Sequence, residues 1–131
     1  MLTIAAGNEG WHIDNTYQPR SAKAGILRAA VVPDGGTQTA FCDGQAAFDA
    51  LDQATRERID GLAAYHSGLY SQAKLGQDPS GATPEQPIPG GIYMAKAFLR
   101  PLVKTHPTTG RKGLHIGRHA FGIPGMDTEE A

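Results

Sequence analysis

The hydrophobic pattern near the start of the chain predicts a β-hairpin. Residues 24–32 form a mostly apolar run, and residues 33–36 (Pro-Asp-Gly-Gly) are dense in turn-forming types. Residues 37–42 then resume with strand-favouring side chains. Two apolar runs separated by a tight turn are typical of antiparallel strands, so we expect the first hairpin here.

A similar pattern predicts a second hairpin near the end of the chain. Residues 100–106 and 111–117 flank the turn-forming segment 107–110 (Pro-Thr-Thr-Gly). Pro101 is expected at the start or the edge of a strand, because proline lacks the N–H that a central strand must donate.

Between the two hairpins the spacing of apolar residues becomes helical from Asp43 onward. Two stripes at helical spacing predict two short helices with a break near residues 52–55. The first stripe is Ala47, Leu51 and Ala54, and the second is Ile59, Leu62, Ala63 and His66.

Two further segments complete the predicted organisation. Residues 76–91 contain four prolines and four glycines, which predicts a flexible exposed loop. Asp127 followed by Glu130 is typical of a helix start. A chain of 131 residues allows one domain or part of one. The order of hairpins, helices and loop predicts a β-rich α+β unit. We expect this unit to stop where its last helix begins.

Composition narrows the class of protein. With 12 basic and 13 acidic residues the chain has a formal charge of −1, which gives no electrostatic basis for binding nucleic acid. No run of about 18 apolar residues suggests a membrane span, and the first ten residues do not resemble a signal peptide. We therefore expect a soluble, cytoplasmic protein, in which the single Cys42 is a buried free thiol.

The candidate chemistry lies in His12-Ile-Asp14. In an extended strand, residues two apart project from the same face, so an imidazole and a carboxylate would converge. Joined by one distant histidine, such a pair forms the facial triad of non-haem Fe(II) oxygenases. The spacing alone equally fits a surface strand with a hydrogen-bonded histidine and a solvated aspartate.

The order of the motifs is more specific than any one of them. They are Asn8-Glu-Gly-Trp-His-Ile-Asp-Asn-Thr-Tyr17, Gly35-Gly-Thr-Gln-Thr39, Asp43-Gly-Gln-Ala-Ala-Phe-Asp-Ala-Leu51, Gly61-Leu-Ala-Ala-Tyr-His-Ser67 and Val103-Lys-Thr-His-Pro-Thr-Thr-Gly-Arg-Lys112. In this order the chain resembles the taurine dioxygenase family of Fe(II)- and 2-oxoglutarate-dependent dioxygenases. Residues 66–70 and 118–125 are more similar to its 2,4-dichlorophenoxyacetate dioxygenase branch.

The resemblance implies a set of site residues and cofactors. His12 and Asp14 would be the catalytic iron ligands, and Thr39 would hydrogen-bond a carboxylate of 2-oxoglutarate. Asn8 would help to shape the co-substrate pocket, and residues 117–121 would form one of its walls. The reaction implied is hydroxylation by O2 of a small organic acid, of the aryloxyacetate or sulfonate type, with release of succinate and CO2.

The resemblance also implies the fold. Residues 1–131 would be a single, partial catalytic domain, built as part of a double-stranded β-helix (jelly roll) with a helical and loop insertion. The family's C-terminal strands, its distal iron-binding histidine and its 2-oxoglutarate-binding arginine have no counterpart in this sequence. We therefore expect an internal fragment of a larger enzyme, inactive in isolation, with a homo-oligomeric full-length protein as an open alternative.

Two other classes of function remain as alternatives. One is a non-catalytic β-rich binding domain or degenerate relative that keeps the front half of the fold. The other is a zinc-dependent hydrolase, in which His12 and Asp14 recruit one further histidine. The candidates for that third ligand are His66, His106, His115 and His119. Of these, His66 and His106 are expected to be buried, hydrogen-bonded residues without a chemical role.

Overall fold

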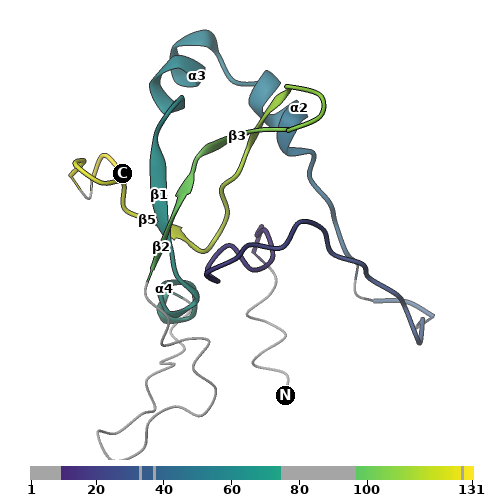
Figure 1. Ribbon diagram of the computed structural model, residues 1–131. Helices are drawn as coiled ribbons and strands as arrows, with labels where there is room; N and C mark the ends of the chain where they lie inside the picture. Colours follow the sequence, from purple (N-terminus) through teal and green to yellow (C-terminus); the bar gives the residue numbers. More distant parts are fainter. Residues whose placement is uncertain (1–9, 33, 37, 75–96, 128) are drawn as a thin grey trace, which may run out of the picture.

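The computed structural model describes residues 10–32, 34–36, 38–74, 97–127 and 129–131 (Figure 1). Within these ranges, two short helices precede the first strand, a third lies between the first and second strands, and the strands form two small antiparallel sheets. The predicted loop 76–91 and the candidate residue Asn8 lie outside the described residues.

Two aspartates determine where the first helices begin. Helix α2 (Gly44–Asp49) starts after Asp43, whose carboxylate accepts hydrogen bonds from the next turn's backbone N–H groups. Helix α3 (Gln53–Ile59) starts in the same way after Asp52. Side-chain oxygens at this position satisfy N–H groups that have no partner within the helix. Two short helices are present as expected, with the break at residues 50–52, but the second helix ends at Ile59 and does not continue along the predicted stripe to His66.

Replacing Asp52 by alanine is expected to lower the melting temperature of the complete gene product by roughly 3–5 °C. The variant loses the bonds that Asp52 accepts from the backbone N–H and the hydroxyl of Thr55. These bonds also hold the pKa of Asp52 below its usual value. Asn caps helices about as well as Asp, so Asp52→Asn is the matched control and should melt close to the parent at neutral pH. Equal losses in both variants would contradict the capping role.

The larger sheet is formed by three strands in the order β2–β1–β5. Strand β1 (Ala63–His66) pairs antiparallel with β2 (Phe98–Pro101) on one side and with β5 (Ala120–Phe121) on the other. The predicted second helical stripe is therefore wrong in its latter half. Ala64 and His66 are buried while Tyr65 is exposed, which is the period of two expected of a strand.

The smaller sheet confirms the predicted second hairpin. Strand β3 (Val103–Thr105) pairs antiparallel with β4 (Lys112–Leu114), and helix α2 packs on β4. The turn between them is closed by a hydrogen bond from the Gly110 N–H to the His106 carbonyl at 2.9 Å. Pro101 is the last residue of the edge strand β2, in agreement with the expectation for proline.

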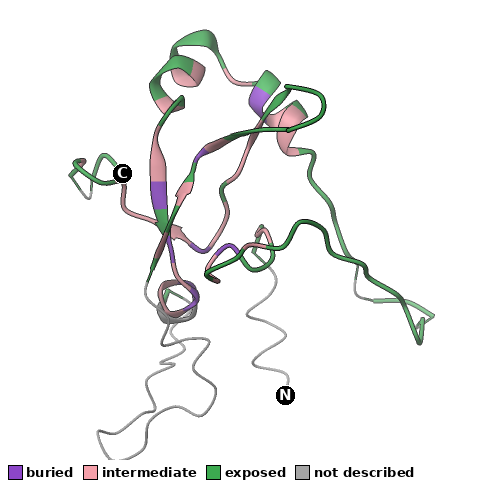
Figure 2. Ribbon diagram, viewed as in Figure 1, coloured by how far each residue is buried: buried purple, intermediate pink, exposed green. Residues whose placement is uncertain are grey.

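The predicted first hairpin is wrong. Residues 24–32 and 38–42 form no strand, and all of them are exposed (Figure 2). Ile26 is 96% exposed and Val31 85% exposed. Cys42 is also exposed, which corrects the expectation of a buried thiol. A run of apolar residues forms a strand only where a partner strand pairs with its backbone and a core covers its side chains. In the described part of the chain neither is present for this segment.

The buried interior is small and unusually polar. Among the described residues the buried apolar side chains are Phe48, Ala64 and Leu102, whereas the buried polar ones are Thr16, His66, Ser71 and His119. His66 is buried as expected, but its two ring nitrogens have no hydrogen-bond partner among the described residues. His106, expected to be buried, is exposed at the hairpin turn.

The remaining elements are short. Helix α4 (Gly68–Ala73) follows β1 directly. The predicted helix start at Asp127 is a single turn, in which its carbonyl accepts hydrogen bonds from the N–H groups of Glu130 and Ala131. No helix in the described ranges is long and apolar enough to cross a membrane.

Candidate metal centre

The structure brings His12 and Asp14 together as the sequence predicts, although not on a strand. Residues 11–13 are irregular and residues 14–17 form a turn, in which Asn15 has a positive φ of 61°. His12 Nε2 lies 3.3 Å from Asp14 Oδ1. The imidazole is 25% exposed and the carboxylate is 67% exposed, so the pair is open to solvent on the Asp14 side. A turn has replaced the strand but still brings the two side chains to one point.

The hydrogen bond of the other ring nitrogen orients His12 for ligation. Nδ1 lies 2.7 Å from the carbonyl oxygen of Gly10. A carbonyl can only accept, so Nδ1 carries the proton and, in the neutral ring, Nε2 presents a lone pair toward the carboxylate. Two electron-rich atoms facing each other at this distance require a proton or a cation between them. A backbone carbonyl on the second ring nitrogen is the usual support of a metal-bound histidine, so the pair fits a ferrous ion.

A second histidine, His119, lies close to His12. The ring of His119 lies edge-on to Tyr17, with centroids 4.6 Å apart, and its centroid is 6.0 Å from that of His12. The Ser71 hydroxyl donates to the carbonyl of Gly68, so its oxygen accepts from His119 Nδ1 at 2.9 Å. Burial, with smaller effects from neighbouring positive charge, lowers the pKa of His119 to about 4. This ring is therefore neutral at pH 7, with a fixed orientation.

The other predicted site residues are not assembled with the pair. Thr39 is exposed, and among the described residues it makes no hydrogen bond. No group of three or more His, Cys, Asp or Glu side chains able to hold a metal occurs within the described ranges. His66, His106, His115 and His119 are thus not gathered around His12 and Asp14 as a third ligand. The structure therefore brings together His12 and Asp14, without a third such side chain among the described residues.

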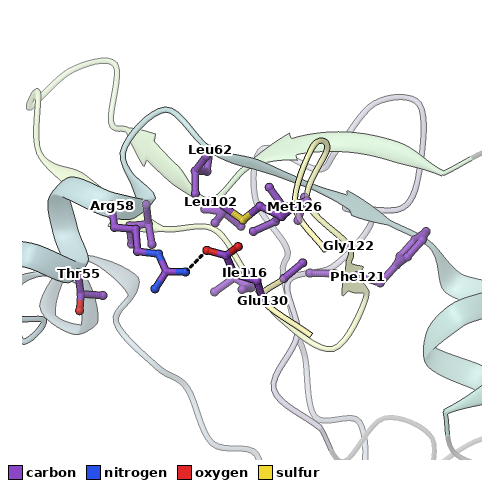
Figure 3. A pocket seen from close by; sticks show the side chains of 14 residues that line it. Thr55, Arg58, Leu62, Leu102, Ile116, Phe121, Gly122, Met126 and Glu130 are labelled. Carbon is purple, nitrogen blue, oxygen red and sulfur yellow. Dashed lines mark hydrogen bonds and ion pairs between the residues drawn. The ribbon is translucent and has the colours of Figure 1, made fainter. Parts of the chain in front are cut away.

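A separate apolar hollow of about 310 Å³ lies between α3, β1 and the C-terminal segment (Figure 3). Its lining includes Leu62, Leu102, Ile116 and Phe121, and an ion pair between Arg58 and Glu130 at 2.7 Å crosses it. His12, Asp14 and Thr39 do not line this hollow. Its surface can accommodate apolar groups, but it is not part of the candidate metal centre.

Sequence reasoning missed the residues that hold this centre in place. Arg100 on β2 donates hydrogen bonds to backbone carbonyls of residues 16–19, and Thr16 is buried beneath them. Ser71 was not a candidate either, although it orients His119. All these contacts join residues more than 40 positions apart, and no local spacing in the sequence signals them.

A turn that brings together one imidazole and one carboxylate, with a backbone carbonyl on the second ring nitrogen, matches the donor types that mononuclear iron centres use. The chain belongs to the family described as taurine catabolism dioxygenase TauD, TfdA family, whose model matches residues 2–131. This confirms the resemblance on which the site residues were assigned.

Curated relatives agree with this membership. The chain is 49% identical over 131 residues to a protein of Sphingobium herbicidovorans named (S)-phenoxypropionate/alpha-ketoglutarate-dioxygenase, covering all of this chain and 45% of the relative. It is 37% identical over 123 residues to the alpha-ketoglutarate-dependent 2,4-dichlorophenoxyacetate dioxygenase of Cupriavidus pinatubonensis, covering 94% of this chain and 40% of the relative. The chain thus spans less than half the length of these relatives.

A comparison with a solved structure agrees with the membership of this family. The crystal structure of AAD-2 in complex with Mn(II) and N-oxalylglycine matches with a TM-score of 0.81 and 39% sequence identity. The match covers 95% of this chain and 46% of that chain. The mixed arrangement of helices and small sheets is therefore that of part of a known dioxygenase fold.

Proposed function

We propose that the complete gene product is an Fe(II)- and 2-oxoglutarate-dependent dioxygenase that oxidises a small organic acid of the aryloxyalkanoate type. The observation that supports this most directly is the convergence of His12 and Asp14 at 3.3 Å in a chain of this family. The relatives named for phenoxypropionate and 2,4-dichlorophenoxyacetate support the substrate class. The complex of AAD-2 with Mn(II) and N-oxalylglycine supports a divalent metal and a 2-oxo acid as its companions.

His12 and Asp14 would bind the metal through Nε2 and a carboxylate oxygen. When bound, Fe(II) with 2-oxoglutarate would supply the oxidation of a substrate C–H bond by O2. The Gly10 carbonyl keeps the lone pair of His12 directed at the metal, and the exposed side of Asp14 leaves room for the remaining ligands. Thr39 is proposed to hydrogen-bond a carboxylate of 2-oxoglutarate, and Asn8 is proposed to help shape the pocket for the co-substrate and substrate.

The products follow from the position of the oxidised carbon. An aryloxyalkanoate carries its reactive C–H between an ether oxygen and a carboxylate. Hydroxylation there gives a hemiketal-type carbon, whose C–O bond breaks to release a phenol and a 2-oxo acid. One O2 is consumed, with one oxygen atom entering the substrate and the other entering succinate, while 2-oxoglutarate loses CO2.

We further propose that the two described sheets belong to a double-stranded β-helix that is completed outside residues 1–131. The TM-score of 0.81 over 95% of the chain supports this architecture. It would also give residues 24–42 the strand partners and apolar cover that they lack among the described residues. On this proposal the third metal ligand comes from a part of the same protein outside residues 1–131.

The function is tested by product analysis with the complete gene product, Fe(II) and 2-oxoglutarate. Both enantiomers of 2-phenoxypropionate are compared with 3-phenylpropionate, which has no ether oxygen and is the matched control. The proposal expects phenol and succinate in equal amounts from a phenoxypropionate, and no phenol from the control. Phenol release that needs Zn(II) but not 2-oxoglutarate would replace the proposal by the hydrolase alternative. Absence of substrate-dependent succinate with every aryloxyalkanoate would overturn the substrate class.

A further inference from the structure

The segment that carries His12 and Asp14 is held by distant parts of the chain rather than by secondary structure of its own. It passes beside β5 and α4 as an irregular stretch (Figure 1). The carbonyl of Trp11 accepts a hydrogen bond of 2.9 Å from the backbone N–H of Arg118. Beyond Asp14, the carbonyl of Thr16 in the turn and those of Gln18 and Pro19 just after it accept hydrogen bonds from Arg100. The metal-binding pair is therefore fixed on both of its sides.

Gly117 determines how closely the first anchor can approach. A Cβ atom at this position would lie 2.9 Å from the Cα atom of His12 and 3.0 Å from the Trp11 carbonyl oxygen. Real Cβ contacts are essentially never shorter than about 3.0 Å, and both neighbours are backbone atoms that cannot rotate away. Any side chain at Gly117 would push the backbone that carries the imidazole outward. Glycine is thus required here by the close approach of two chain segments.

Arg100 forms the second anchor through a single guanidinium group. Its Nε donates to the Thr16 carbonyl at 2.9 Å, and its Nη2 donates to the carbonyls of Gln18 and, at 3.4 Å, Pro19. The rigid planar fork of arginine can reach several carbonyls at once, which the single ammonium of lysine cannot reproduce. This fork ties the turn that begins at Asp14 to strand β2.

We propose that Gly117 and Arg100 are positioning residues that hold His12 and Asp14 in a metal-binding geometry. The inference rests on the proposed function, because it takes these two side chains to be metal ligands. Ligands on an irregular segment must otherwise be ordered when the metal binds, and that ordering reduces affinity. Supporting groups around a metal ligand typically change the metal affinity by about 10–100-fold when they are removed. We expect the two anchors to act in this range.

The test measures Mn(II) affinity of the complete gene product by electron paramagnetic resonance of the free ion, at a temperature where every variant is folded. Gly117→Ala and Arg100→Gln are each expected to raise the dissociation constant by roughly 10-fold or more. Arg100→Lys is expected to fall between Arg100→Gln and the parent, because the charge remains and the fork is lost. These readouts do not depend on turnover.

The chain offers a matched control for each anchor. A Cβ at Gly44 would lie 2.8 Å from the Leu114 carbonyl oxygen, a clash of the same kind between α2 and β4. Gly44→Ala should therefore destabilise the fold but leave Mn(II) affinity within twofold of the parent. Arg111→Gln, which removes an exposed ion pair with Asp49, should leave the affinity unchanged.

The outcomes separate the proposed metal centre at His12 and Asp14 from the positioning role of Gly117 and Arg100. If His12→Ala does not weaken Mn(II) binding, the proposed metal centre itself is wrong. If His12→Ala weakens binding but the folded Gly117→Ala and Arg100→Gln variants do not, the positioning role is wrong and the metal centre stands. Equal weakening by Gly44→Ala and Gly117→Ala would mean general destabilisation and would overturn the role of Gly117. If Gly117→Ala does not fold, the Arg100 series decides.

Discussion

Replacing His12 by alanine is expected to abolish 2-oxoglutarate-dependent turnover of the complete gene product. The variant removes the nitrogen that lies 3.3 Å from Asp14 and that the Gly10 carbonyl orients. Loss of a supporting group already costs a metal site about 10–100-fold in affinity, and loss of a ligand must cost more. Mn(II) affinity should therefore fall by more than about 100-fold, and succinate formation should fall to the level of the metal-free protein.

His106→Ala is the matched control for this variant. His106 is exposed at the turn of the second hairpin, where its Nδ1 accepts hydrogen bonds from the N–H groups of Thr108 and Thr109. Its loss should affect the hairpin slightly and leave Mn(II) affinity and turnover close to those of the parent. Normal succinate formation in His12→Ala, or equal losses in the two variants, would contradict the assignment of His12.

Local signals in the sequence predicted the elements that depend on local contacts. The second hairpin was correct because its turn residues and both strands lie within residues 100–117, so that pairing requires only a short loop closure. The caps that the structure shows at Asp43 and Asp52 are equally local, since each acts on the next few N–H groups. These features need no information from the rest of the fold.

Elements that depend on distant partners were predicted less well. Ala63 and His66 fit a helical stripe by spacing, yet they form a strand because β2 and β5 pair with both edges of that segment. The run 24–32 has strand-like composition but no partner within the described residues. Propensity is a weak preference that tertiary pairing overrides.

In the candidate site, too, local features could be predicted from the sequence and long-range contacts could not. His12 and Asp14 are two positions apart, and a local turn is enough to bring them together, so the motif could be read directly. Arg100 and Gly117 act across more than 80 positions, and their chemical types alone do not distinguish them from other arginines and glycines of the chain. The structure is needed to find what fixes the motif, whereas the motif itself is visible in the sequence.

Acid is expected to destabilise the fold through His66 as the pH falls below about 6.5. His66 is 1% exposed on β1, and neither ring nitrogen has a partner among the described residues. Burial, reinforced by the nearby His115 and Arg100, lowers its pKa from 6.5 to about 4. The folded state therefore keeps this ring neutral between these two values, whereas the unfolded state binds a proton.

The sign of the effect follows from that difference in bound protons. The unfolded chain takes up more protons below pH 6.5, so the free energy of unfolding decreases as the pH falls from about 6.5 to about 4. A shift of this size corresponds to about 3 kcal/mol for one histidine. Burial also lowers the pKa of His115, which lies 6.3 Å from His66 between ring centroids, so it adds to the loss in the same direction.

His66→Met isolates this contribution, because methionine fills a similar volume without a titrating group. The free energy of unfolding, measured by urea titration of the complete gene product at pH 7.5, 6 and 4.5, should decrease less steeply in this variant than in the parent. The difference between the two pH profiles should approach 3 kcal/mol at the acid end. Parallel profiles for His66→Met and the parent would show that His66 is not the acid-sensitive group.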